Sequence, residues 1–288
     1  GGETVELSEA ARLVLACAIL MGAWWLTEAV PLPVTALLPM VLFPVFDVGS
    51  ISDISAHYGH PLIFLFLGGF IVAIAIQKWN LHSWVASFII YHFAASERRL
   101  LAGFMLATAF LSMWLSNTAT AIMMLPIALS IIAHQRKNGN RGKNGGFDQN
   151  LLLGVAYSAS IGGTLTLIGS PPNLFTASFL EKSLGVSISF GEWFLFASPG
   201  ALILLPFTWW LLSRRLESGN TQEPEIREGM GYDHFRELPK GTQKVALIFL
   251  ATTLLWTSRP FLTNVSVGSN YPFASITDTT IALCAAFS

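Results

Sequence analysis

The chain has 288 residues and a formal net charge of −1; 53% of its residues are hydrophobic and only 11% are charged. A soluble globular domain carries about 25% charged residues, so this composition, with a mean hydropathy of +0.58, excludes an ordinary soluble domain. Its basic residues form no tract interleaved with aromatic side chains, so we expect no nucleic-acid partner and predict a lipid bilayer as the surroundings.

The apolar residues gather in blocks long enough to cross a hydrocarbon core of about 30 Å, which takes about 20 helical residues. Backbone groups in lipid must be satisfied internally, and the alternating pattern of outer-membrane strands is not visible. We therefore predict an all-α membrane protein with polytopic helices. The first helix runs from Glu9 to Val30 and is broken by Pro31-Leu-Pro33. Its acidic start lacks the basic region of a signal peptide, so we expect a mature helix.

The next blocks complete a predicted scaffold over residues 1–95. A second apolar stretch ends near Phe46, and a polar connection follows to His60. A third helix is expected over residues 61–79 and a shorter fourth one over residues 81–94.

Residues 100–133 are uncharged throughout and are interrupted in the middle by Ser116-Asn117-Thr118. One helix of this length would measure about 50 Å, too long for the membrane, and two full spans would need about 40 residues. Both flanks, Arg98-Arg99 and Arg136-Lys137, are basic, which places both ends in the cytoplasm. A re-entrant helical hairpin with its polar tip near mid-bilayer meets these constraints.

Residues 151–179 start like a span but contain Gly162-Gly163 and then Gly169-Ser-Pro-Pro-Asn173. Two prolines in series end a helix, so we predict a discontinuous helix with backbone groups exposed at the break. With the hairpin and a sixth helix over residues 193–212, it is predicted to form one unit, residues 96–213.

Residues 214–244 are predicted to be a cytoplasmic linker, and residues 245–288 to hold a seventh helix and the start of an eighth that is truncated at Ser288. With the N-terminus inside, every Lys and Arg falls on the cytoplasmic side except Lys78, Lys182 and Arg259, as the positive-inside rule requires. We thus expect a multi-pass protein of the inner or plasma membrane with a cytoplasmic N-terminus. Because the chain stops within an apolar run, we also expect it to be a fragment.

A re-entrant hairpin beside a broken helix is the recurring construction of secondary transporters. Half-helix N-termini offer N–H groups to an anion, and hydroxyl and carbonyl oxygens suit Na⁺. Ser116, Asn117 and Thr118 supply two hydroxyls and a carboxamide, and Ser112 lies one turn earlier on the same face. Isolated Ser and Thr residues in helices usually bond their own i−4 carbonyl. Three polar residues in series within an uncharged hairpin favour a binding site.

Other polar residues are weaker candidates. Glu28 is an intramembrane carboxylate, and such groups often have a function. Its position beside Thr27 and Pro31 instead favours a structural role at the membrane interface. Cys17 and Cys284 fall in apolar blocks and are read as packing residues. The histidines lack metal-ligand spacing. No catalytic triad, phosphate loop or paired carboxylates occur, so we expect neither an enzyme nor an organic cofactor.

Two longer motifs resemble a known family. Trp-Leu-Ser-Asn-Thr-Ala-Thr (114–120) with Met-Met-Leu-Pro (123–126), and Ile-Gly-Gly-Thr (161–164) with Gly-Ser-Pro-Pro-Asn (169–173), resemble the two signatures of the divalent anion:sodium symporters. Trp-Trp-Leu-Thr-Glu-Ala-Val-Pro (24–31) and Lys-Trp-Asn-Leu-His (78–82) look like the family's first and third helices. The family comprises sodium-coupled di- and tricarboxylate carriers and related exchangers.

The resemblance implies roles for individual residues. Ser116, Asn117 and Thr118 would bind a substrate carboxylate, and Ser112, Ser116, Asn117, Gly162 and Gly163 would hold Na⁺. Thr164, Gly169, Pro171 and Asn173 are candidates of a second tier. The family has an inverted repeat with a second Ser-Asn-Thr hairpin, which is missing from these residues, so the chain would hold half of the substrate site.

We therefore predict a homodimeric secondary transporter, working by an elevator movement, that couples Na⁺ to uptake of succinate-, malate-, fumarate- or citrate-like anions. One alternative is a Na⁺-independent dicarboxylate exchanger of the same fold. Another, from a different class, is a membrane assembly subunit that does not transport and uses the hairpin for packing.

Overall fold

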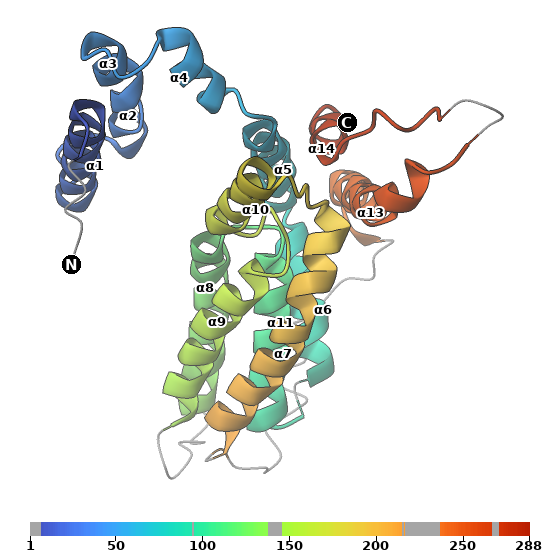
Figure 1. Cartoon of the computed structure of the whole chain (residues 1–288). Helices are drawn as coiled ribbons and strands as arrows, with labels where there is room; N and C mark the ends of the chain where they lie inside the picture. The colour runs from blue at the N-terminus through green and yellow to red at the C-terminus, as the bar shows by residue number, and fades with distance from the viewer. Residues whose placement is uncertain (1–6, 94, 138–145, 215, 217–236, 267–270) are drawn as a thin grey trace, which may run out of the picture. The chain divides into compact units, whose positions relative to one another are not determined.

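A computed structural model describes residues 7–93, 95–137, 146–214, 216, 237–266 and 271–288 (Figure 1). Within those ranges the chain is helical and contains no strand, which confirms the predicted all-α class. It divides into two compact units, residues 1–63 and residues 64–288. Most of the predicted linker at 214–244 lies outside the described residues.

The first unit consists of four helices: α1 (Glu9–Thr27), α2 (Leu32–Thr35), α3 (Leu38–Val45) and α4 (Ile51–Tyr58). The Ser8 side chain caps the start of α1, which ends at Glu28 in a left-handed conformation with φ of 51°. The predicted polar connection before His60 contains α4, which begins where the Ser50 hydroxyl accepts the N–H of Asp53 at 3.1 Å. Tyr58 closes the unit by donating to the carbonyl of Ala36 at 2.7 Å.

The hairpin segment of the second unit has the predicted pattern of helix, break and helix. After α5 (Pro61–Lys78) and α6 (Leu81–Phe93), α7 covers Glu97–Ser112 and α8 covers Asn117–Lys137. The break between α7 and α8 falls at residues 113–116, so it includes Ser116 of the predicted polar tip, whereas Asn117 and Thr118 are the first residues of α8. The depth of this tip in a bilayer stays a prediction.

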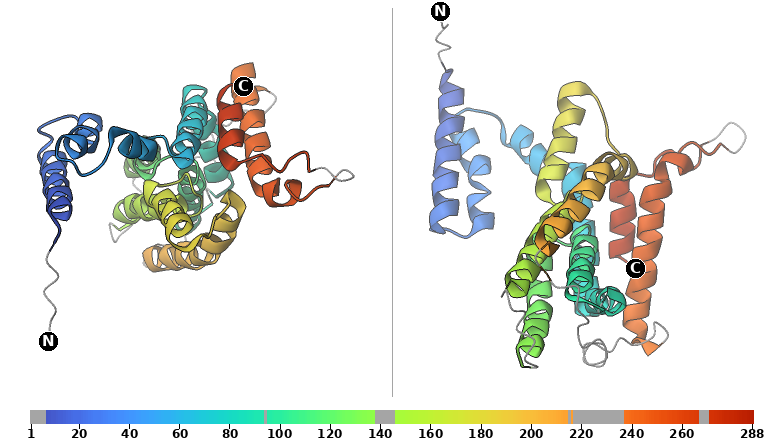
Figure 2. Two further views of the ribbon diagram at one scale, coloured as in Figure 1. Left: turned by 45° about the horizontal axis from the view of Figure 1, so that its top comes forward. Right: turned by 90° about the horizontal axis from the view of Figure 1, so that it is seen from below.

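The predicted broken helix is likewise two helices, α9 (Phe147–Gly163) and α10 (Pro171–Leu184), separated by residues 164–170. The sixth helix is α11 (Phe190–Ser213), and α13 (Lys240–Leu262) and α14 (Asp278–Ala286) follow. The last two lie side by side in Figures 1 and 2.

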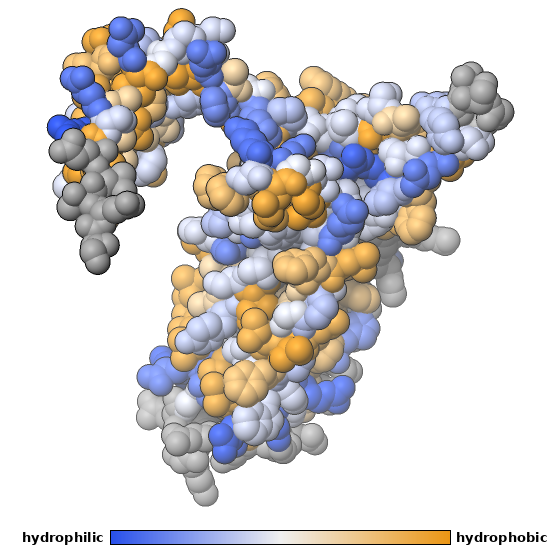
Figure 3. Space-filling model, viewed as in Figure 1, coloured by the Kyte–Doolittle hydropathy of each residue, from blue (hydrophilic) through white to orange (hydrophobic). Residues whose placement is uncertain are grey.

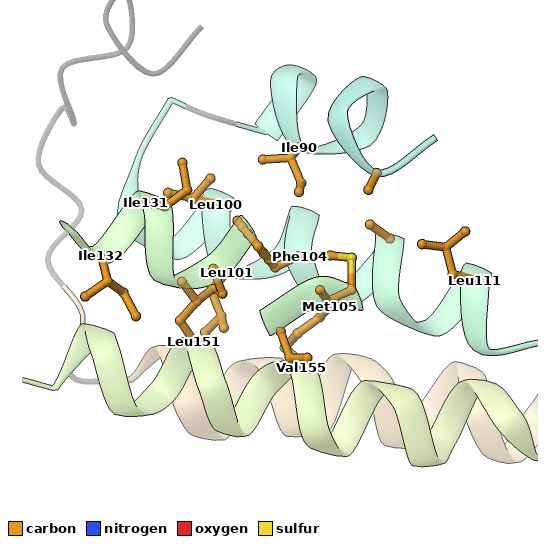
Figure 4. Close-up of a cluster of buried hydrophobic side chains, with 14 of the residues drawn as sticks. Ile90, Leu100, Leu101, Phe104, Met105, Leu111, Ile131, Ile132, Leu151 and Val155 are labelled. Carbon is orange, nitrogen blue, oxygen red and sulfur yellow. The ribbon is translucent and has the colours of Figure 1, made fainter. Parts of the chain in front are cut away.

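The core of the second unit lies among α6, α7, α8 and α9. Figure 4 shows Ile90, Phe104, Ile131 and Leu151, one from each helix, converging in it. Small residues let the helix backbones approach: a Cβ on Gly154 would lie 2.7 Å from the Leu101 side chain. In a bilayer the hydrophobic effect does not drive helices together, so helices associate through close packing at small residues.

Four helical stretches among the described residues are long and apolar enough to cross a membrane. They are Glu9–Thr27, Ile51–Lys78, Phe190–Ser213 and Lys240–Leu262. Many of their large apolar side chains are exposed; Phe196 on α11 is 81% exposed. Figure 3 shows apolar side chains along the face formed by α9 and α11. Such surfaces require lipid around the folded chain.

Candidate functional site

The hairpin tip begins where α7 ends. Ser116 takes the capping position of α8: its hydroxyl accepts the N–H of Ala119 at 3.3 Å and its carbonyl accepts the N–H of Thr120 at 2.9 Å. Capping satisfies amides that a helix start would otherwise leave without partners. Asn117 is half-buried at the first position of α8, and Thr118 is exposed beside it. The tip thus presents a helix N-terminus flanked by two hydroxyls and a carboxamide.

Ser112 is fully buried and brings three oxygens together. Its hydroxyl lies 2.9 Å from the Asn117 carboxamide oxygen and 2.7 Å from the carbonyl oxygen of Ala159 on α9. A hydroxyl carries a single proton, so it can donate to only one of these acceptors at a time. Three oxygens that share one proton form an electron-rich cluster, which is the environment a small hard cation requires.

Two glycines allow this cluster to form. A Cβ on Gly163 would collide with the Asn117 carboxamide, and a Cβ on Gly162 would collide with the backbone of Ala109. Only glycine therefore lets the end of α9 pass so close to the hairpin. The structure brings together four of the predicted sodium-site residues: Ser112, Asn117, Gly162 and Gly163.

Asn173 holds the break between α9 and α10. Its buried amide nitrogen donates to the carbonyls of Gly163 at 2.8 Å and Thr166 at 2.7 Å. Gly169 lies against the same carbonyl, because a Cβ there would be 2.6 Å from the Gly163 oxygen. Pro171 occupies the first position of α10, where a missing N–H costs nothing. Of the second-tier candidates, Gly169 and Asn173 thus lie at the site.

Thr164 differs from those residues. Its hydroxyl bonds the carbonyl of Ile161 in its own helix at 2.8 Å, as an isolated threonine commonly does. Its carbonyl accepts the indole N–H of Trp193 at 3.0 Å, which ties the break to the start of α11. These two contacts of Thr164 hold the loop between α9 and α10 in place.

Thr166 joins the two halves of the site and was not singled out from the sequence. Its buried hydroxyl donates to the carbonyl of Met113 in the hairpin break and accepts the N–H of Gly169 at 3.0 Å. In the sequence, only its position between two glycine motifs indicates that Thr166 belongs to the site. Thr164 has the same position, so the sequence does not distinguish the two.

An aromatic cluster lies under the tip. The Trp114 ring stacks on Phe190 at 5.9 Å and on Trp256 at 6.3 Å, and meets Phe249 edge-on at 4.7 Å, measured between ring centroids. These rings come from α11 and α13. Trp114, two positions before Ser116, therefore links the tip to both helices. The sequence motif did not predict this cluster.

The buried carboxylate of this region belongs to Asp278 at the start of α14. It accepts the N–H of Phe190 and pairs with the Arg259 guanidinium, both at 2.9 Å. Its carbonyl accepts the indole N–H of Trp256 at 3.0 Å. Glu28, by contrast, is exposed. In the described part of the chain, no three His, Cys, Asp or Glu residues are grouped to hold a metal ion.

Comparisons with known proteins show which family the chain resembles. The model of the citrate transporter family matches residues 23–285. Two proteins named sodium-dependent dicarboxylate transporter SdcS, from Staphylococcus aureus strains USA300 and NCTC 8325, are each 40% identical over 261 residues. Each match covers 86% of this chain and 49% of the relative. The chain thus spans about half the length of the curated relatives it matches.

Proposed function

Because the chain belongs to the citrate transporter family and carries apolar helices long enough to span a bilayer, we propose that it is part of a secondary active transporter. This transporter couples Na⁺ movement to the uptake of a di- or tricarboxylate anion of the succinate, malate, fumarate or citrate class. The proposed activity is transport rather than catalysis, and Na⁺ is one of the transported ions.

One observation supports the sodium site above all others, namely the three oxygens of Ser112, Asn117 and Ala159 around a single hydroxyl proton. Sodium would bind these oxygens through their lone pairs, and the Ser112 hydroxyl would keep its proton and turn it away from the ion. Oxygen atoms are the ligands that hard cations prefer. The backbone of Gly163 lies against the Asn117 carboxamide, and it would complete the coordination together with Gly162 and the hydroxyl of Ser116.

The carboxylate would bind where two helix starts meet. α8 begins at Asn117, whose carboxamide lies on Gly163, and α10 begins near Gly163 through the Asn173 amide. Two positive helix ends at one point favour a negative group. Ser116, Asn117 and Thr118 would contact one carboxylate through hydroxyl, carboxamide and backbone amide groups, without an arginine.

The larger assembly follows from the same proposal. Residues 1–95 would form a scaffold against which residues 96–213 move as an elevator, and residues 245–288 would open the second repeat. The protein would be a homodimer in the inner or plasma membrane, with the N-terminus in the cytoplasm. Its site would be completed by the partner hairpin of the repeat.

Uptake of labelled succinate by proteoliposomes containing the full-length protein tests this function. We expect uptake with an inward Na⁺ gradient and little uptake in choline buffer. Equal uptake in both buffers would identify the Na⁺-independent exchanger instead. Asn117→Ala separates transport from a purely structural hairpin: undiminished uptake and unchanged protection of the site by substrate would show that the tip serves packing alone.

A further inference from the structure

A second site lies at the opposite end of α7 from the hairpin tip, in a groove between α7 and α11. The groove encloses about 290 Å³. Its walls include Phe93 at the end of α6, Leu106 on α7, and Leu205 and Trp209 on α11. Arg99 is the only charged residue among the side chains that line it. The groove is therefore an apolar channel with one guanidinium at its border.

Tryptophans and arginines are fixed at this end of the groove. The Trp209 indole N–H donates to the carbonyl of Arg98 at 2.9 Å, and the Arg98 guanidinium lies 5.6 Å from the centre of the Trp209 ring. The Arg214 guanidinium lies 4.7 Å from the centre of the Trp210 ring. These distances are within the range of cation–π contacts, which hold long side chains in place.

The position along the helices identifies this level as a membrane interface. Trp209 and Trp210 lie in the last turn of α11, which is apolar and exposed over most of its length, and Arg214 follows directly. Tryptophan and arginine gather where hydrocarbon gives way to headgroups. Arg99 is exposed in the first turn of α7, and Leu106 is 42% exposed two turns deeper. The groove thus opens outward and runs from the headgroup level toward the hydrocarbon.

The local charge determines which lipid fits. Arg98, Arg99 and Arg214 lie at this level, and Glu97 is the single carboxylate in the same first turn of α7. The balance favours a negative headgroup, and basic clusters next to spanning helices attract anionic lipids. We propose that this groove binds an anionic glycerophospholipid, with its phosphate against Arg99 and part of one acyl chain in the void beside Trp209.

Thermal unfolding of the protein in neutral detergent tests the proposal, because a bound lipid raises the melting temperature. Three additions are compared: phosphatidylglycerol, phosphatidylcholine with the same chains, and glycerol phosphate without chains. We expect phosphatidylglycerol to raise the melting temperature by at least about 3 °C and the other two to have little effect. A phosphatidylcholine shift of equal size would overturn the role of charge, and an equal shift with glycerol phosphate would overturn the role of the groove.

Variants locate the effect. Arg99→Ala should lose the additional shift from phosphatidylglycerol, whereas Arg12→Ala, which removes another exposed arginine near the start of an apolar helix, should keep it. Ala102→Leu fills the groove from α7 and should lose the shift with Arg99 still present. This variant decides the matter if Arg99→Ala does not fold. A full shift in either groove variant would refute the site.

Discussion

The carboxamide of Asn117 occupies the space that a side chain on Gly163 would fill. The first residue of α8 and the last residue of α9 therefore depend on each other, although 45 residues of sequence separate them. This contact brings the two signature motifs to one point and is the basis of the proposed sodium site.

Gly163→Ala tests that dependence. The added methyl group must displace Asn117, and overpacking of this kind costs about 1–3 kcal/mol. We expect a lower melting temperature and loss of Na⁺-driven succinate uptake. Gly200→Ala is the matched control, since a Cβ at Gly200 meets nothing within 4 Å in α11. It should be neutral or slightly stabilising, because alanine favours helix over glycine. Normal uptake by Gly163→Ala would contradict the assigned packing.

Ser112→Ala removes one oxygen from the three-oxygen cluster and leaves the Ala159 carbonyl without its hydroxyl partner. Losing one such interaction costs about 1–2 kcal/mol, so we expect the Na⁺ concentration for half-maximal uptake to rise about tenfold or more. Titration of uptake against Na⁺ at saturating succinate measures this. Ser160→Ala, whose hydroxyl is exposed and bonds only its own helix at 3.3 Å, should leave the titration unchanged. Identical titrations for both variants would remove Ser112 from the site.

Asn173→Ala should destabilise the break between α9 and α10. It deprives two carbonyls of their buried donor, those of Gly163 and Thr166, and each loss costs about 1–3 kcal/mol. Asn173→Asp should be at least as harmful, because it places a carboxylate where a donor was. Asn264→Ala removes an exposed amide that bonds Pro260 at 2.8 Å, and such surface changes stay within about 0.5 kcal/mol. Comparable melting temperatures for Asn173→Ala and Asn264→Ala would show that Asn173 does not hold the break.

Arg259→Ala leaves the Asp278 carboxylate buried without its ion-pair partner. Removing one member of a buried pair costs about 3–5 kcal/mol. Arg136→Ala breaks the exposed pair with Asp148, and such a pair contributes about 0–1 kcal/mol. We expect a large fall in melting temperature for the first variant and almost none for the second. Adding Asp278→Asn to Arg259→Ala should recover part of the loss, whereas further destabilisation would indicate that the carboxylate is stabilised by other groups.

The sequence predicted those parts of the fold that depend on local patterns. The interruptions predicted at residues 116–118 and 169–173 follow from polar and proline residues within apolar segments, and the observed breaks overlap them at residues 113–116 and 164–170. The resemblance also pointed correctly to the family, as the match over residues 23–285 confirms. The division into scaffold and transport domain, and the roles of the site residues, stay predictions.

Contacts between distant segments could not be predicted in this way. Thr166 meets Met113 across 53 residues, and Asp278 meets Phe190 across 88. The sequence does not show whether a threonine in an apolar segment forms a hydrogen bond within its own helix or with another helix. The rings around Trp114 come from two helices, α11 and α13, whose adjacency is a property of the folded chain.

The bond between Asp278 and Phe190 has a consequence for the order of events at the ribosome. The amide at the start of α11 receives its carboxylate partner from a residue made 88 positions later. At about 5–20 residues per second, that partner emerges roughly 4–18 s after Phe190. During this interval the start of α11 has its own Ser189 and Glu192 cap and the bond from Trp193 to the earlier Thr164 carbonyl. The contact between Asp278 and α11 can therefore form only after most of the chain has been synthesised.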